Sequence, residues 1–251
     1  YALAYGPTVP AGWRVPASLR NELTLQADDG STVYAVMALQ PTAARSHAPT
    51  VLYHHGNKSG IDEYWVRVSR LWSLGANVLI YEYPGYGRAA GTPSEAGIYR
   101  NAAAAMNHLR SLRAQIDQDR IFHYGYSLGG GPAVETARSG GAYRGLITES
   151  IFASVDALVA DGSLVLPGSF VAHDDFDNLG KIAAAARASS VGVLLLHGSA
   201  DDFVDPKYLD QLDAAIGTVA AHRKVLVPGA SHTSVPDWPG YDATIKAFLQ
   251  K

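Results

Sequence analysis

The feature of this sequence that most restricts its fold is a regular succession of short apolar runs separated by helical stretches. Runs of this length and composition predict buried β-strands, and their alternation with helices predicts an α/β fold with a mostly parallel sheet. The runs are Thr50–His54, Ala76–Tyr81, Arg120–Tyr124, Gly145–Thr148, Val191–Leu196 and Arg223–Val227. Because parallel strands are buried on both faces, we expect helices to flank the sheet on both sides.

The N-terminal part of the chain has a different pattern. Glu22–Ala27 and Thr32–Leu39 alternate between apolar and polar residues, and an Asp-Asp-Gly-Ser sequence at residues 28–31 joins them. An Asp-Gly turn between two alternating runs predicts an antiparallel hairpin, which makes the sheet a mixed one. Residues 1–20 are rich in proline and glycine and show little periodicity. We expect them to form an extended arm that lies on the domain.

One helix and one irregular segment stand out among the connections between strands. The helix is predicted over Thr92–Gln115, because residues 92–95 form a capping box with Pro93 at the first helical position. Residues from about 151 to 190 contain no clear strand, and we interpret them as a small lid plus one displaced helix. No internal repeat divides the chain, so a single domain over residues 1–251 is expected.

The composition excludes several classes of function. The 20 Lys and Arg residues are fewer than the 23 Asp and Glu residues and form no basic run, so we expect no nucleic-acid partner. The absence of cysteine excludes disulfides, a cysteine nucleophile and cysteine-ligated metal. No apolar run approaches the roughly 18 residues of a membrane span.

The compartment stays open at this point. The sequence begins with Tyr1 rather than Met, and we expect that a segment before it was processed or trimmed. A periplasmic or secreted location after removal of a signal is one interpretation, and the cytoplasm is the other.

A G-x-S-x-G sequence lies where a predicted strand meets a predicted helix. It spans Gly125–Gly129 and directly follows the run Arg120–Tyr124. In this context the chain must turn sharply, which exposes the serine hydroxyl at the strand end. Glycine on either side avoids collisions with the neighbouring strand and helix. We therefore predict Ser127 as a nucleophile; the alternative is a tight turn that only packs or binds phosphate, although no dinucleotide or P-loop motif is present.

Three aspartates follow the next-to-last predicted strand and compete for the role of the acid. A serine hydroxyl needs an adjacent base, and the order serine, acid, histidine along the chain accompanies such a turn. Asp201 is the predicted acid, because it lies three residues after Gly198, where the strand end directs it inward. Asp202 remains the alternative, whereas Asp205 before Pro206 has the pattern of a helix cap.

The predicted base is His232. It lies on the loop 228–233, directly after the last predicted strand. Ligands collect at the carboxyl ends of strands in open α/β sheets, so this loop is well placed for a site. No other histidine of the nine follows the aspartates on such a loop.

The sequence after the first parallel strand, His54-His55-Gly56-Asn57, predicts the remaining part of the site. A serine nucleophile at a turn of this kind is accompanied by two backbone N–H groups that stabilise an oxyanion, and we assign them to Leu128 and Asn57. The imidazoles of His54 and His55 are interpreted as supports of the loop. Adjacent side chains point apart and no third ligand has suitable spacing, so we expect neither a metal nor another cofactor.

Several of these motifs occur together in one known superfamily. They are His55-Gly56-Asn57, Tyr81–Gly87, Gly91–Glu95 with Tyr99, Gly125–Gly130, His197-Gly198 with Asp201 and Val204, and Pro228–Ala230 with His232. In combination they resemble the α/β-hydrolase superfamily, and within it the small-lid serine hydrolases of the depalmitoylase-like and bacterial esterase-like group. The resemblance extends over most of the chain and implies an α/β-hydrolase fold and hydrolysis of an ester or thioester.

The leading functional hypothesis is a carboxylesterase that acts on a small molecule through an acyl-enzyme intermediate. An acyl-protein or acyl-CoA thioesterase, an amidase or peptidase, and a non-catalytic binding protein are the alternatives. The oligomeric state stays open.

Candidate substrate contacts come from two places in the sequence. Tyr64, Trp65 and Tyr126 lie close to the predicted site residues, and the predicted lid offers Phe152, Leu158, Leu164, Leu166 and Phe170. A short lid buries little acyl chain, and each buried methylene contributes about 0.8 kcal/mol. We therefore expect a shallow site that prefers acyl groups of roughly two to six carbons.

Overall fold

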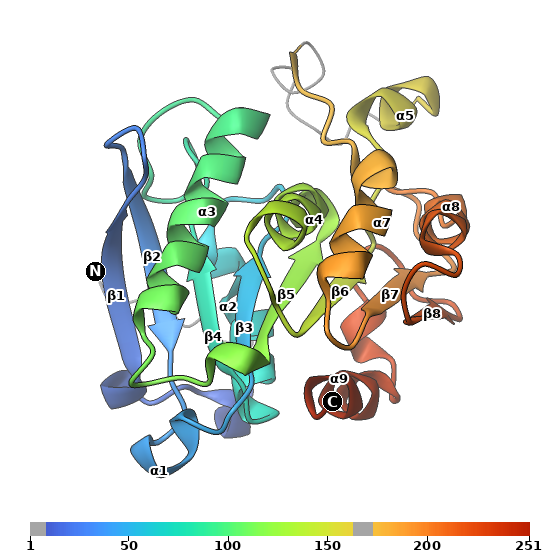
Figure 1. The fold of residues 1–251 in the computed structure, drawn as a ribbon. Coiled ribbons are helices and arrows are strands. Elements are labelled where there is room, and N and C mark those ends of the chain that lie inside the picture. The colour runs from blue at the N-terminus through green and yellow to red at the C-terminus, as the bar shows by residue number, and fades with distance from the viewer. Residues whose placement is uncertain (1–8, 163–172) are drawn as a thin grey trace.

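A central sheet of eight strands organises the computed structural model, which describes residues 9–162 and 173–251 (Figure 1). The strands are β1 (Arg20–Gln26), β2 (Thr32–Ala38), β3 (Thr50–His54), β4 (Asn77–Tyr81), β5 (Ile121–Tyr126), β6 (Gly145–Glu149), β7 (Val193–Gly198) and β8 (His222–Val227). Their order across the sheet is β1-β2-β4-β3-β5-β6-β7-β8. The pairs β1–β2 and β2–β4 are antiparallel and all later pairs are parallel, which confirms the predicted mixed sheet with its N-terminal hairpin.

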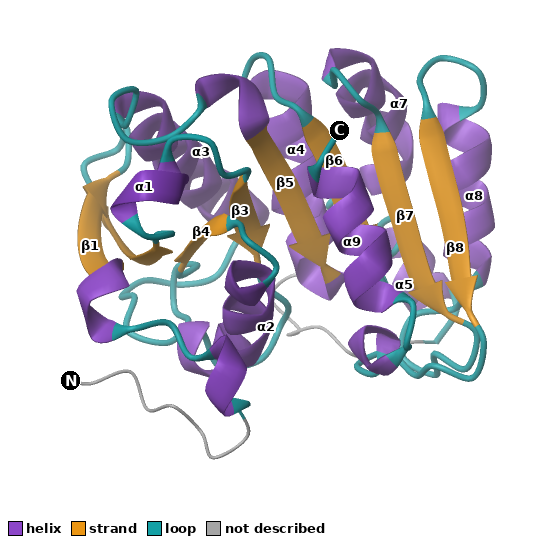
Figure 2. Cartoon of the chain, turned by 90° about the horizontal axis from the view of Figure 1, so that it is seen from below, coloured by secondary structure: helices purple, strands orange, loops and turns teal. Residues whose placement is uncertain are grey.

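Helices enclose the sheet on both faces, as expected for parallel strands (Figures 1 and 2). One face is packed by α2 (Ile61–Ser73) and α9 (Tyr241–Leu249), and the other by α3 (Glu95–Ser111), α4 (Gly130–Ser139), α7 (Asn178–Ala188) and α8 (Lys207–Ile216). Two short helices, α1 (Thr42–Arg45) and α5 (Val155–Ala160), lie outside these layers. Among the described residues, no helix combines the length and the apolar character needed to cross a bilayer.

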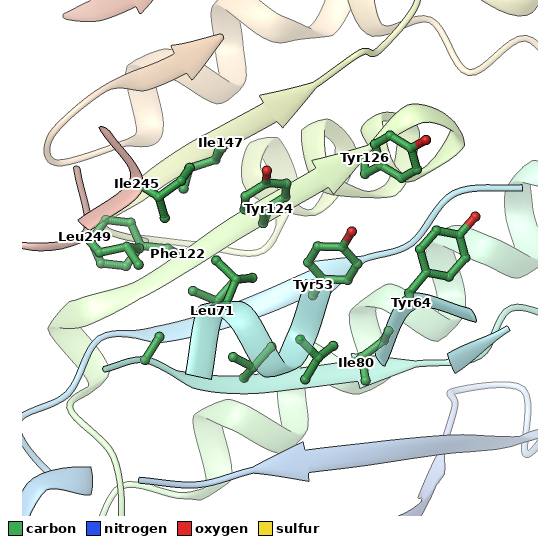
Figure 3. Close-up of a cluster of buried hydrophobic side chains, with 14 of the residues drawn as sticks. Tyr53, Tyr64, Leu71, Ile80, Phe122, Tyr124, Tyr126, Ile147, Ile245 and Leu249 are labelled. Carbon is green, nitrogen blue, oxygen red and sulfur yellow. The ribbon is translucent and has the colours of Figure 1, made fainter. Parts of the chain in front are cut away.

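The alternation of side chains along each strand divides the core into two parts. On β5, Phe122, Tyr124 and Tyr126 all face α2 and α9, because residues two apart share a face of the sheet (Figure 3). Tyr53 of β3 lies beside Tyr124, with ring centroids 5.3 Å apart. A row of tyrosines therefore runs under α2 towards the carboxyl ends of the central strands.

The helix α3 begins later than predicted. It starts at Glu95, and Ser94, which has an extended backbone, caps it by accepting a hydrogen bond from the N–H of Gly97 at 3.2 Å. The predicted capping box at residues 92–95 does not form, because Pro93 packs against the turn at Gly85, where a Cβ would lie 2.8 Å from the proline ring. The helix also ends at Ser111, four residues before the predicted end.

The described part of the N-terminal arm, residues 9–19, lies against the sheet layer on the side of α2. It contains two short 3-10 turns, Ala11–Trp13 and Ala17–Leu19, and buries Val9 and Val15. Residues 9–19 are therefore less extended than expected.

The two helices in the segment interpreted as a lid lie in different places in the structure. Its helix α7 packs between α4 and α8 as part of the layer on the sheet, and α5 lies nearer the strand ends (Figure 1). The predicted lid residues Leu164, Leu166 and Phe170 lie outside the described residues, so the lid itself stays a prediction.

Candidate active site

The turn after β5 holds Ser127 in a backbone conformation that few residues adopt. Ser127 has φ +53°, and the chain passes through the 3-10 turn Ser127–Gly129 directly into α4. The flanking glycines are required by close backbone approaches. A Cβ at Gly129 would lie 2.0 Å from the carbonyl oxygen of His54, and one at Gly125 would lie 2.6 Å from Ala133. The tight strand–turn–helix geometry thus follows from the glycine spacing.

Asp201 lies on the loop after β7 with its carboxylate buried. Its Oδ1 accepts hydrogen bonds from the N–H groups of Phe203 at 3.0 Å and Val204 at 2.9 Å. Its Oδ2 lies 2.8 Å from Nδ1 of His232. The alternative acid, Asp202, is exposed, and the polar hollow that it lines includes neither Ser127 nor His232.

His232 links this carboxylate to the serine. A carboxylate can only accept, so the hydrogen on the His232 ring lies at Nδ1, and Nε2 is left as an acceptor. This Nε2 lies 2.9 Å from the Oγ of Ser127. The three residues that the sequence singled out therefore lie in one hydrogen-bonded chain at the carboxyl ends of β5, β7 and β8.

The surroundings of Asp201 favour its ionised form. Burial alone raises the pKa of this carboxyl group, but the hydrogen bonds from His197, His232 and the Val204 N–H outweigh burial and hold the pKa below its ordinary value. His197 contributes through Nε2, which lies 3.1 Å from Oδ2 of Asp201 and 2.9 Å from the Val204 carbonyl oxygen. Both of these neighbours are acceptors, so the Nε2 of His197 carries a hydrogen.

The loops that carry Asp201 and His232 are joined to each other. The N–H of Ser199 donates to the carbonyl of Val227, and the N–H of Ala200 donates to that of Ala230, both at 2.9 Å. Gly198 permits this contact, since a Cβ there would lie 2.2 Å from the carbonyl oxygen of Ala230. The acid and the base are therefore held as a pair.

The loop after β3 approaches the same place. At Gly56 a Cβ would lie 2.8 Å from the hydroxyl of Tyr64 and 3.0 Å from the ring of Tyr126, so glycine lets this loop pack closely. The hydroxyl of Tyr86 donates to the side-chain oxygen of Asn57. Leu128, the second residue predicted to supply an N–H group, is buried in the turn after Ser127.

The adjacent histidines of this loop are buried and make different contacts. Nδ1 of His55 lies 2.8 Å from the carbonyl of Gly56, its ring stacks on Tyr83 at 3.9 Å, and burial lowers its pKa to about 4. His54 instead pairs with Tyr81 and His123 on the other side of the sheet. In residues 9–162 and 173–251, no group of three or more His, Asp or Glu is arranged to hold a metal ion.

A cavity of about 240 Å³ opens beside Ser127. It is lined by Asn57, Lys58, Tyr64, Tyr126, Ser127, Phe152, Phe203, Val204, His232 and Thr233. Trp65 lies in the core under α2 rather than in this lining, because consecutive helical residues point about 100° apart. Phe170 is outside the described residues.

The sequence analysis missed four of the lining residues: Lys58, Phe203, Val204 and Thr233. Each lies within three residues of a predicted site residue, and that proximity is the signal that could have identified them. Phe203 carries a further signal in the sequence, since it is a large apolar residue in an acidic loop. In the structure Phe203 is 52% exposed and lines the cavity instead of the core.

Comparisons with known proteins identify relatives of this chain and structures with a similar fold. A family model described as Chlamydia CHLPS protein (DUF818) matches residues 44–138. The α/β hydrolase domain-containing protein WAV2 of Arabidopsis thaliana is 31% identical over 235 residues, which cover 84% of this chain and 74% of the relative. An uncharacterised protein of Mycobacterium tuberculosis is 30% identical over 234 residues, covering 92% and 78%. The solved structure of a Pyrococcus furiosus esterase is similar with a TM-score of 0.73 and 17% identity, covering 100% of this chain and 97% of that one.

Proposed function

The chain belongs to the α/β-hydrolase family, and on this premise we propose that it is a serine hydrolase that cleaves carboxylic esters. The observation that carries the proposal is the hydrogen-bonded chain from Ser127 through His232 to Asp201, with distances of 2.9 and 2.8 Å. A serine, a base within hydrogen-bond reach and a third group that orients the base are the requirements for nucleophilic catalysis. The similar fold of the Pyrococcus furiosus esterase is consistent with this chemistry.

The proposed reaction proceeds through two half-reactions. Oγ of Ser127 attacks the acyl carbon while Nε2 of His232 takes its proton, and Asp201 stabilises the imidazolium that forms. The N–H groups of Leu128 and Asn57 bind the oxyanion of the tetrahedral intermediate. When the intermediate collapses, the carbon–oxygen bond to the leaving group breaks, and His232 gives its proton to the departing alkoxide oxygen, which leaves as the alcohol. Water, activated by His232, then attacks the acyl-enzyme and releases the acid.

The size of the cavity supports short acyl groups. About 240 Å³ lies below the roughly 300–1,000 Å³ of pockets that bind drug-sized ligands. Its apolar walls, which include Tyr64, Phe152 and Val204, suit a hydrocarbon chain. Because each buried methylene contributes about 0.8 kcal/mol, catalytic efficiency is expected to rise only until the cavity is full, at roughly two to six carbons.

The test combines covalent labelling with a series of substrates. A fluorophosphonate probe should label the wild-type protein and not Ser127→Ala, and p-nitrophenyl esters should be hydrolysed best with short acyl chains. A thioester and an anilide of the preferred acyl group, assayed beside the ester, distinguish a thioesterase or amidase from an esterase. A protein that binds the esters without labelling or turnover would be a binding protein, and the proposal would be refuted.

A further inference from the structure

Arg67 is a buried cation that lies near the candidate site without lining its cavity. It projects from α2, and only 13% of its side chain is exposed. Nη1 donates to Oε1 of Glu149 at 2.7 Å, and Nη2 donates to the carbonyl oxygen of Thr233 at 3.3 Å. The guanidinium also lies 4.0 Å from the centroid of the Tyr126 ring. One side chain thus contacts three separate parts of the chain.

All three contacts of Arg67 lie at or next to the strand ends that carry the candidate site. Tyr126 directly precedes Ser127, and Thr233 directly follows His232. Glu149 is the last residue of β6, the strand between β5 and β7 in the sheet. Figure 3 shows Tyr126 at the carboxyl end of β5, beyond Tyr124 on the same face. Arg67 therefore connects the nucleophile turn to the loop of the base.

We propose that Arg67 is a positioning residue for the hydrolysis, which holds Ser127 and His232 in register through Tyr126 and Thr233. This inference rests on the proposed function. A guanidinium suits the task because its planar set of donors can bind a carboxylate and a carbonyl while its face stacks on an aromatic ring. A lysine ammonium is a single compact charge and cannot reproduce this geometry.

The alternative explanation is that Arg67 and Glu149 form an ion pair that only stabilises the fold. Buried ion pairs contribute little net stability, because desolvation of both charges offsets their attraction. Glu149 has a second donor in the hydroxyl of Tyr124, which itself lies 2.7 Å from the hydroxyl of Tyr241. Tyr124 therefore holds the Glu149 carboxylate in place independently of Arg67. The carboxylate in turn orients the guanidinium of Arg67 towards the carbonyl of Thr233.

A double variant separates the two explanations. Arg67→Met combined with Glu149→Gln removes both charges together, so no unpaired charge is left buried, and glutamine keeps an acceptor for Tyr124. The matched control is Arg70→Met. Arg70 lies one turn along on α2, is paired with Asp242 at 2.6 Å, and stacks on Trp13 and Tyr241 at 4.8 Å, away from Ser127 and His232.

The variants are compared with the wild type by urea unfolding, steady-state kinetics on a p-nitrophenyl ester, and the rate of fluorophosphonate labelling. A misplacement of about 1 Å between reacting groups costs about 100-fold in rate. We expect the double variant to remain folded with KM within twofold, while kcat and the labelling rate fall by about 10- to 100-fold. Arg67→Lys should recover only part of this loss, and Arg70→Met should leave kcat within twofold.

Two results would overturn the inference. If the double variant keeps kcat within twofold of the wild type, or loses no more than Arg70→Met, Arg67 has no positioning role. If the wild-type protein neither labels nor hydrolyses any ester, the proposed function fails and the role of Arg67 fails with it. The wild-type assay, performed first, distinguishes these cases.

Discussion

Replacing Asp201 with asparagine should abolish most of the activity while leaving the fold intact. Oδ1 of Asp201 accepts from the N–H groups of Phe203 and Val204, and these donors will hold the amide oxygen of the new side chain. The amide nitrogen then takes the place of Oδ2 and faces Nδ1 of His232, where it can only donate, while the Nε2–H of His197 keeps its bond to the Val204 carbonyl. The imidazole must therefore accept at Nδ1 and carry its hydrogen at Nε2, so it can no longer take the proton of Ser127.

The expected loss is about 10⁴-fold in kcat, as for the corresponding substitution in another serine hydrolase. It corresponds to about 5.5 kcal/mol of transition-state stabilisation, since each tenfold change is worth about 1.4 kcal/mol. The assay is the hydrolysis of a p-nitrophenyl ester, and circular dichroism checks that the variant is folded. Asp202→Asn is the matched control, because Asp202 is exposed and is absent from the lining of the cavity beside Ser127. Asp201→Asn activity above a tenth of wild type, or an equal loss in Asp202→Asn, would refute the assignment of the acid.

Three further predictions concern the nucleophile, its turn and the loop beside it. Ser127→Ala should lower kcat by about 10⁶-fold, and hydrolysis above a few per cent of wild type would contradict its role. Gly129→Ala should destabilise the protein by about 3 kcal/mol in urea unfolding, because its Cβ would lie 2.0 Å from a backbone oxygen, whereas Gly12→Ala, with open space around it, should change little. Glu82 directly follows β4, and its Oε2 lies 3.7 Å from Nε2 of His55 in the loop after β3. Burial raises the pKa of Glu82 from 4.5 to about 7, so stability should fall as the pH rises between these values, and Glu82→Gln should remove this fall. Equal pH dependence of the wild-type and Glu82→Gln unfolding midpoints would show that Glu82 titrates normally.

The central strands β3 to β7 could be predicted from the sequence because each is a short apolar run that is fully buried. The run Thr50–His54 matches β3 residue for residue, since all five residues are buried and the run has no polar interruption. The start of α3 could not be predicted in the same way. Thr92 and Ser94 are both good caps, and the choice depends on the packing of Pro93 against Gly85, which is a tertiary contact.

The same holds for the candidate site: residues determined by their sequence neighbours could be predicted, and residues determined by contacts with distant parts of the chain could not. Ser127 is recognisable because the glycines that its turn needs lie beside it in the sequence. The choice of Asp201 over Asp202 depends on backbone donors two and three residues later, so the sequence could favour one but not exclude the other. Arg67 gave no signal at all, because its partners Glu149 and Thr233 lie 82 and 166 residues away.

The backbone of Ser127 also has a consequence for how this chain can evolve. A left-handed conformation costs a residue with a side chain about 1–2 kcal/mol, and glycine avoids that cost. A chain selected for thermal stability alone would therefore carry glycine at position 127. The gain in the free energy of unfolding would be a substantial fraction of the roughly 5–15 kcal/mol by which a domain is typically stable. If Ser127 is the nucleophile, as proposed, selection for stability and selection for its reactive hydroxyl oppose each other at this residue. Thermostable variants of this protein must obtain their gains elsewhere, and an unguided search for stability would tend to inactivate it.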